Sequence, residues 1–241
     1  MKIREEETIA NIVKKDFRTA QIFNSHGLDF CCGGKKELAE ACEEQGVDTQ
    51  LVMSQLMLAM TDKNDEITYE TMSNTELIAH IVEVHHKYIE ESVPYLSQLL
   101  RKIAEVHGER HQELETVRDI FDEATDALYD HMKKEELILF PAIVDMEKAK
   151  SQDKPLPQLA FGSISNPIQA MEGEHDFEGE SFKSIARLTD NFTPPDDACS
   201  TYQVAFAKLK EFVDDLHRHI HLENNILFEN AVAIELEIKS S

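Results

Sequence analysis

A short pattern occurs twice in this sequence and constrains the fold more than any other feature. In both copies a His is followed four residues later by a Glu, and Ile-Leu-Phe begins seven residues after the His. The copies start at His131 and His219, so the acidic residues are Glu135 and Glu223. Positions four apart lie on one face of a helix, so each copy presents an imidazole beside a carboxylate. Two such pairs that face each other are a common way to hold two metal ions between helices.

The residues around both pairs have the spacing of a helix-bundle core. Alternating steps of four and three residues place successive side chains on one core-facing stripe. Each His-Glu pair takes two consecutive places on such a stripe, so all four side chains are predicted to point inward. The two stripes are Val117, Phe121, Ala124, Leu128, His131, Glu135, Ile138 and Ala142, and Ala205, Leu209, Phe212, Leu216, His219, Glu223, Ile226 and Asn230.

Two further long segments each contribute one core histidine. His175 lies on a stripe within residues 164–185, His86 lies on a stripe within residues 82–103, and His85 fits less well. Burying four imidazoles and two carboxylates in an apolar bundle is costly unless they are paired or bind metal. A single core histidine is usually hydrogen-bonded structure, and a purely structural network is the alternative here. Six polar residues with one repeated spacing favour a metal site.

The types of ligand narrow the choice of metal. Imidazole and carboxylate together suit iron, manganese or zinc, and the lack of core thiolates disfavours a structural zinc site. Two carboxylates shared among four imidazoles favour two bridged ions, with coordination positions left open for a small ligand. The ligands alone do not distinguish iron from manganese.

Composition and charge exclude several classes of protein. Only 8 Gly and 7 Pro in 241 residues indicate long helices with few turns. The formal net charge of −23 argues against nucleic-acid binding and against an anionic membrane surface, because both need clustered Lys and Arg. We find no apolar run long enough to span a membrane and no secretory signal at the start, so a cytoplasmic location with reduced cysteines is expected.

We predict an all-α chain of two parts. Residues 1–60 form a small helical domain, residues 61–72 a polar linker, and residues 73–241 a four-helix bundle. Pro94 and Pro141 lie inside predicted bundle helices, and each should kink its helix or mark a boundary. The four long helices are expected at about 74–107, 110–148, 165–191 and 199–235.

Within the first domain, three helices are predicted. One contains Ile9 to Phe17 with Thr8 as its N-cap, a second starts near Lys35, and a third spans about 49–60. The third is expected to turn Leu51, Leu56 and Met57 inward.

Cys31 and Cys32 are adjacent and precede Gly33 and Gly34. Backbone amides and a nearby lysine (Lys35 or Lys36) are expected to lower a thiolate pKa there, which would make a redox or iron-transfer thiol pair. The alternative is a tight turn with incidental thiols. Four other residues are expected to be unremarkable: Cys42 and Cys199 as plain residues, and His217 and His221 as solvated side chains that face away from the core stripe.

The chain resembles the repair-of-iron-centres family of di-iron proteins, and its second domain resembles hemerythrin-like four-helix bundles. The resemblance covers nearly the whole sequence, and the combination of Cys-Cys-Gly-Gly with the bundle motifs is specific. The matching motifs are Asp29-Phe-Cys-Cys-Gly-Gly-Lys35, His80-x5-His86, His131-x3-Glu135-x2-Ile-Leu-Phe-Pro141, Met171-Glu-x-Glu-His175-Asp, Thr193-Pro-Pro and His219-x3-Glu223-Asn-Asn-Ile-Leu-Phe228.

The resemblance implies a cofactor of two non-haem iron ions, bridged by carboxylates and by an oxo group. The implied ligands are His86, His131, Glu135, His175, His219 and Glu223, with the two Glu as bridges. It also implies repair of iron–sulfur clusters damaged by oxidative or nitrosative stress, through iron donation to the damaged proteins. Cys31 and Cys32 would take part in that transfer, and a homodimer is expected.

Other functions remain open at this point. A di-iron sensor of nitric oxide or oxygen is the main rival, and nitric oxide reduction at the centre would make the chain an enzyme. An oxygen carrier would be expected to use more histidines and has no need of Cys31 and Cys32. An iron-storage shell has little support, because one pair of sites holds few ions.

Overall fold

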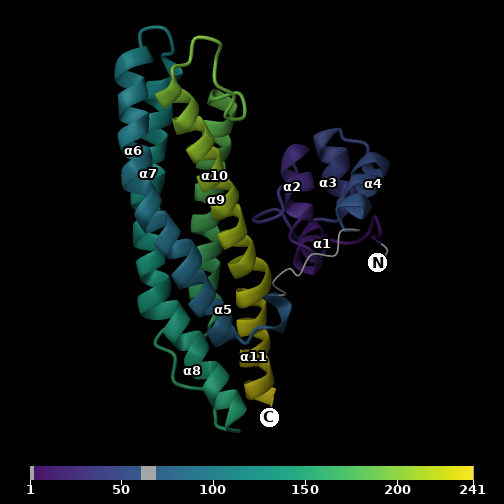
Figure 1. Ribbon diagram of the computed structural model, residues 1–241. Helices are drawn as coiled ribbons and strands as arrows, with labels where there is room; N and C mark the ends of the chain where they lie inside the picture. Colours follow the sequence, from purple (N-terminus) through teal and green to yellow (C-terminus); the bar gives the residue numbers. More distant parts are fainter. Residues whose placement is uncertain (1–2, 61–68, 241) are drawn as a thin grey trace.

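The computed structural model describes residues 3–60 and 69–240. Helices dominate this part of the chain, and a single isolated bridge pairs Thr8 with Glu37. Figure 1 shows a long bundle of helices with a small group of N-terminal helices beside it. The prediction of an all-α fold with a small helical region before a bundle is therefore confirmed.

The N-terminal group contains four short helices: α1 (Ile9–Lys15), α2 (Thr19–Ser25), α3 (Leu38–Gln45) and α4 (Thr49–Ala59). The Thr8 hydroxyl accepts a hydrogen bond from the Asn11 amide at the start of α1, as an N-cap should. The Asp48 carboxylate does the same for α4. Helix α2 was not predicted, and α3 begins later than expected.

The predicted inward face of α4 is partly wrong. Leu56 is buried as expected, but Leu51 and Met57 are 47% and 45% exposed. Val52 is fully buried instead, four residues before Leu56. Because α4 packs mainly against α2 and α3, its buried stripe is narrow, and the residues on either side of that stripe remain in solvent.

The expected linker, residues 61–72, lies mostly outside the described residues. Its described end contains a short 3-10 turn, Tyr69–Thr71. The Ser73 hydroxyl and the Glu76 carboxylate then form a capping box that starts the first bundle helix. The exact domain boundaries stay a prediction.

Four long helical segments form the bundle, and three of them contain a π-helical turn. They are α5 (Asn74–His80), η2 (Ile81–His86) and α6 (Lys87–His107); α7 (Glu113–Lys134), η3 (Glu135–Leu139) and α8 (Phe140–Ser151); α9 (Ser165–Leu188); and α10 (Ser200–Leu222), η4 (Glu223–Leu227) and α11 (Phe228–Ser240). Pro94 lies inside α6, whereas Pro141 stands in the first turn of α8, directly after a π turn.

The π turns correct two of the predicted core positions. Ile138 and Asn230 were expected to face the core, but both are exposed. Leu139 and Ala231, one residue further on, are buried in their place. A π turn has i→i+5 hydrogen bonds and so inserts one residue into the helix, which shifts the inward face beyond it by one position.

Two apolar clusters make up the bundle core. One contains buried side chains of α6, of α7 and of most of α10, and it continues into the N-terminal helices. The other contains side chains of α5, α8 and α11. The core His and Glu residues lie between these two clusters on each helical segment. The polar residues therefore form a layer inside an otherwise apolar bundle core.

Candidate metal centre

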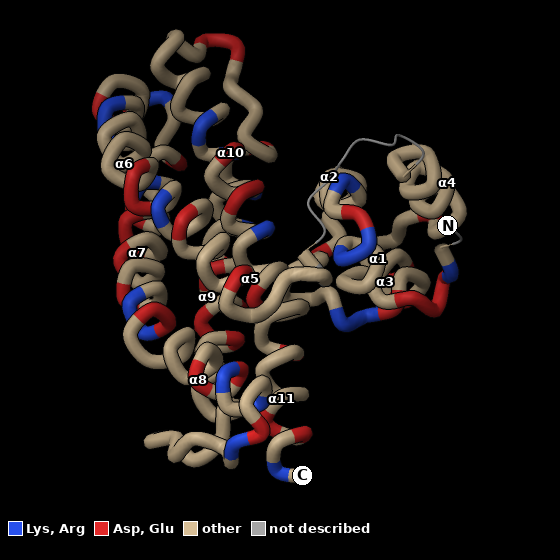
Figure 2. Tube along the Cα trace, turned by 60° about the horizontal axis from the view of Figure 1, so that its bottom comes forward, with Lys and Arg blue, Asp and Glu red and all other residues tan. Residues whose placement is uncertain are grey.

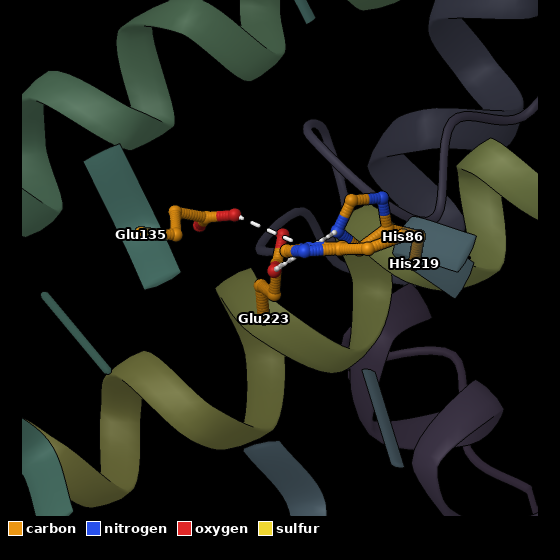
Figure 3. Close-up of side chains that lie close together, drawn as sticks. All are labelled: His86, Glu135, His219 and Glu223. Carbon is orange, nitrogen blue, oxygen red and sulfur yellow. Dashed lines mark hydrogen bonds and ion pairs between the residues drawn. The ribbon is translucent and has the colours of Figure 1, made fainter. Parts of the chain in front are cut away.

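The structure brings the six predicted ligands together in two overlapping groups. One contains His86, Glu135, His219 and Glu223, and the other contains His131, Glu135, His175 and Glu223. In each group the ligand atoms lie within 4.8 Å of one another, and every member is buried. Figure 3 shows the first group, with the side chains converging from different helices. Both groups share Glu135 and Glu223, as two bridged metal positions require.

The imidazoles of each group point at a common place. The Nε2 atoms of His86 and His219 lie 3.1 Å apart, and those of His131 and His175 lie 3.0 Å apart. A metal ion is bound by such converging ring nitrogens, so each pair marks one metal position.

The two oxygens of Glu223 face different groups. Oε1 is 3.0 Å from Nε2 of His219, while Oε2 is 3.2 Å from Nε2 of His175. Glu135 also lies between the groups but approaches both with one oxygen, because Oε2 is 3.5 Å from His86 Nε2 and 3.3 Å from His131 Nε2. Each carboxylate is therefore placed to bridge two ions.

The π turns coincide with the candidate ligands. Glu135 is the first residue of η3, Glu223 is the first residue of η4, and His86 is the last residue of η2. π turns are rare and are frequently found at functional sites. Here they explain how His85 and His86, although adjacent, are both buried.

Three of the four imidazoles have a partner on the other ring nitrogen. Nδ1 contacts a Glu136 oxygen at 2.7 Å in His86, a Glu174 oxygen at 2.9 Å in His131, and Asn224 Oδ1 at 2.8 Å in His175. The Nδ1 atom of His219 has no hydrogen-bond partner. Such partners fix the orientation of a metal-binding imidazole and raise its basicity.

Charge pairing outweighs burial for three of the four imidazoles, His86, His131 and His175. Burial alone lowers the pKa of His86, but its contacts with Glu135 and Glu223 raise that pKa to about 10. Burial also lowers the pKa of His175, which Glu223 nevertheless raises to about 10. For Glu223 burial acts upward, yet the surrounding imidazoles hold its pKa well below the usual value. Burial instead lowers the pKa of His219, so the carboxylates favour positive charge on three of the four imidazoles.

The buried carboxylates are incompletely satisfied by the protein alone. Neither oxygen of Glu135 has a hydrogen-bond partner, although imidazoles lie close by. Unsatisfied buried carboxylate oxygens are costly, and bound cations would satisfy them. The residues present therefore fit a pair of metal ions.

His85 and Glu178 are buried but lie outside both groups. His85 Nδ1 is 3.0 Å from an Asp215 oxygen. Glu178 lies on the buried stripe of α9, three residues after His175, and neither of its oxygens has a hydrogen-bond partner among the described residues. Burial raises the pKa of Glu178 to about 7, although His131 and His175 act to lower it.

Cys31 and Cys32 lie in the loop between α2 and α3, and both are free thiols whose Sγ atoms are 3.8 Å apart. Oδ1 of Asp29 accepts hydrogen bonds from both backbone amides. The expectation of a lowered thiol pKa is wrong for Cys31. The contact with Cys32, burial and the Asp29 charge raise the Cys31 pKa well above its usual value.

The two lysines that were expected near the thiols are engaged elsewhere. Lys35 pairs with Glu172 of α9, and Lys36 pairs with Glu44. Neither ammonium group is therefore placed to stabilise a thiolate at Cys31.

The cysteine loop packs against the bundle close to a candidate ligand. Cys32 Sγ lies 3.5 Å from the carbonyl oxygen of His175. A Cβ atom added to Gly179 would lie 3.4 Å from the same sulfur, so a small residue at this position of α9 leaves room for the thiol. The structure thus places the thiol pair beside the helix that carries His175.

The expectation that His221 is solvated is also wrong. Its side chain is 1% exposed, and its ring packs against Phe17 and Phe30. His217 is half-buried against the same Phe30 ring. Both residues face away from the bundle core, as expected, but residues of the N-terminal region cover that face. The spacing of residues within one bundle helix could not predict this cover.

Comparisons with known proteins agree with this architecture. A family model described as a hemerythrin HHE cation-binding domain matches residues 77–231, and the ScdA_N model, a domain of unknown function, matches residues 5–60. The iron-sulfur cluster repair protein YtfE of Yersinia pestis (strain Pestoides F) is 35% identical over 216 residues, 89% of this chain and 91% of the relative. The protein of that name from Yersinia pseudotuberculosis serotype IB (strain PB1/+) has the same identity and coverage. This chain belongs to the YtfE family of iron-sulfur cluster repair proteins.

In this YtfE-family chain the matched cation-binding domain contains both His/Glu groups. Because the groups share Glu135 and Glu223, they form a bridged site for two metal ions. Of the helices in the described ranges, none has the length and apolar character needed to cross a membrane.

Proposed function

We propose that this chain restores damaged iron–sulfur clusters by donating iron from the bridged two-metal site. The observation that carries the proposal is that Glu135 and Glu223 each belong to both His/Glu groups. The names of the relatives, which are iron-sulfur cluster repair proteins, supply the biological setting. The partners are accordingly damaged iron–sulfur proteins.

The six residues have distinct roles in this proposal. His86 and His219 would hold one ion, His131 and His175 would hold the other, and the two glutamates would be shared between them. Bound iron would supply both the cargo for repair and a redox-active centre with open coordination positions. Because Glu135 and Glu223 reach the site as side chains of packed helices, their carboxylates would be able to release an ion while the bundle stays folded.

Cys31 and Cys32 are proposed to receive the iron on its way to an acceptor. The ligand atoms of Asp29, Cys31 and Cys32 lie within 4.8 Å of one another, and Cys32 touches the backbone of α9 at His175. Thiolates and a carboxylate suit iron, and the protonated state of Cys31 means that binding would release a proton. A homodimer would bring two such loops into one assembly.

A di-iron centre that reacts with nitric oxide or oxygen is the second candidate. It is favoured by one feature, since four imidazoles and two shared carboxylates leave coordination positions open on each ion. Reversible gas binding without loss of iron would support that function, and turnover of nitric oxide would make the chain an enzyme.

The first experiment is to measure iron content and the absorption spectrum of protein from iron-replete cells. About two irons per chain, with the near-ultraviolet bands of an oxo-bridged ferric pair, are expected from two bridged positions. The loaded protein is then mixed with a damaged iron–sulfur enzyme, and recovery of that enzyme is followed. Cys31→Ala and Cys32→Ala should reduce recovery without reducing the iron content. Recovery that does not depend on loaded protein would contradict the proposal.

A further inference from the structure

The two metal positions do not have equivalent surroundings. We refer to them as the His131–His175 position and the His86–His219 position. Both share Glu135 and Glu223, so any difference must come from the residues around them.

The first difference lies in the next layer of the bundle. On each helix we compare the residue that lies three positions from the histidine, toward the apolar cluster that contains α6 and α7. These residues are Leu128 for His131, Leu216 for His219, Ile89 for His86 and Glu178 for His175. All four are at most 1% exposed. A single carboxylate therefore stands among three aliphatic side chains, next to the polar layer.

Glu178 has no hydrogen-bond partner in the part of the chain that the structure describes. Neither of its oxygens makes a hydrogen bond, and burying a carboxylate in such surroundings is costly unless a cation is near. The positive groups that stabilise its charge are the imidazoles of His131 and His175. Glu178 therefore belongs with the His131–His175 position, while Ile89 occupies the corresponding place three residues from His86.

The second difference lies in the hydrogen bonds to the imidazoles. In the His131–His175 position both Nδ1 atoms have partners, Glu174 and Asn224. In the His86–His219 position only His86 has one, because Nδ1 of His219 is buried without a partner. Loss of such a partner typically weakens metal affinity by about 10–100-fold. Both differences favour the same position.

We propose that the His86–His219 position gives up its ion first and that Glu178 holds the other ion in the His131–His175 position. The inference rests on the proposed function, and it assigns the donated iron to a particular place. The chain would then deliver one ion readily and keep the second, so that a partly loaded centre remains in place after donation.

The test is the release of iron from the loaded full-length protein to ferrozine under reducing conditions. Two phases of about one equivalent each are expected, with the slow phase at least about tenfold slower. Protein that has lost the fast equivalent is crystallised, and the remaining iron is located by anomalous scattering. An ion between His131 and His175 supports the proposal. A single release phase, or a remaining ion between His86 and His219, overturns it.

Variants test the role of Glu178 separately. Glu178→Gln should accelerate the slow phase by about tenfold and leave the fast phase unchanged. Glu180→Gln is the matched control, because Glu180 is exposed on the same helix and pairs with Arg187. An unchanged slow phase in the Glu178 variant would contradict its role. If that variant does not fold, the location of the retained ion in the wild-type protein still decides the question.

Failure of this inference is distinguishable from failure of the proposed function. Protein that releases its two ions unequally, but does not restore damaged clusters, would overturn repair and leave the inequality intact. Protein that restores clusters but releases both ions in one phase would overturn the inequality of the two positions and leave the repair function intact.

Discussion

At the scale of single residues, the shared carboxylates distinguish this site from a pair of separate metal positions. Glu135 and Glu223 are fully buried, and each lies within 3.5 Å of imidazoles of both groups. Such a carboxylate contributes to the retention of both ions, so its loss should affect both positions.

Glu135→Leu should therefore weaken iron binding much more than it changes the fold. We expect affinity to fall by more than about tenfold, since even residues behind the ligands have effects of that size. Iron content after gel filtration with a chelator measures retention, and circular dichroism measures helicity. Glu123→Leu, at an exposed position of α7, is the control. Full iron occupancy in the Glu135 variant would show that this residue is not a bridge.

The titration of the imidazoles predicts how the metal-free protein responds to pH. Contacts with carboxylates raise the pKa of His86 and His175 to about 10 and that of His131 to about 9, against a burial effect in the opposite direction. Above pH 6.5 the folded state therefore binds more protons than the unfolded state, and stability falls as pH rises toward these values.

Urea unfolding of the metal-free protein should accordingly give a lower free energy of unfolding at pH 8.5 than at pH 6.5. This range lies below the ordinary pKa of lysine and tyrosine. Loaded protein should lack this loss, because metal replaces the protons on the imidazoles. Equal stability of the metal-free protein at both pH values would show that the imidazoles do not hold extra protons when folded.

At the scale of helices, the π turns determine which side chains face the core beyond the ligands. From the end of η3 and beyond η4, the core-facing residues are displaced by one position from an ordinary helix, as Leu139 and Ala231 show. The adjacent pair Ile138 and Leu139 gives a matched test of this register, since Ile138 is 52% exposed and Leu139 is 1% exposed.

Leu139→Ala should lower the free energy of unfolding by about 2–5 kcal/mol, as deletion of a buried leucine side chain usually does. Ile138→Ala should change it by less than about 0.5 kcal/mol. Chemical denaturation of both variants measures the difference. A larger loss in the Ile138 variant would mean that the helix continues without the inserted residue.

The same feature shows what the sequence could and could not predict. Spacing of four and three residues was enough to identify the six core polar residues, because the steps between them and their apolar neighbours can be followed without crossing an inserted residue: Glu135 and Glu223 begin their π turns, and α9, which carries His175, has none. It misplaced Ile138 and Asn230, because an inserted residue leaves no mark in apolar periodicity. Leu51 and His221 were misjudged for another reason: their exposure depends on how separate helices pack, which the pattern within one helix does not contain.

At the scale of the whole molecule, the N-terminal helices lie against one side of the bundle, as Figure 1 and Figure 2 show from two directions. Ion pairs between the two parts, such as Lys35 with Glu172 and Lys14 with Glu229, involve partly exposed side chains. Exposed pairs typically contribute only about 0–1 kcal/mol. The buried contact is different in kind, because the Asn225 side chain donates a hydrogen bond to the carbonyl oxygen of Cys31.

Asn225→Ala should therefore release the cysteine loop far more readily than Lys35→Ala. The first variant leaves the Cys31 carbonyl oxygen without its partner at a cost of about 1–3 kcal/mol, whereas the second should cost less than about 1 kcal/mol. The rate at which iodoacetamide alkylates Cys32 reports the opening, and about 1.4 kcal/mol corresponds to a tenfold increase. Equal rates in both variants would mean that surface charge, rather than the buried contact, holds the thiol pair beside the helix of His175.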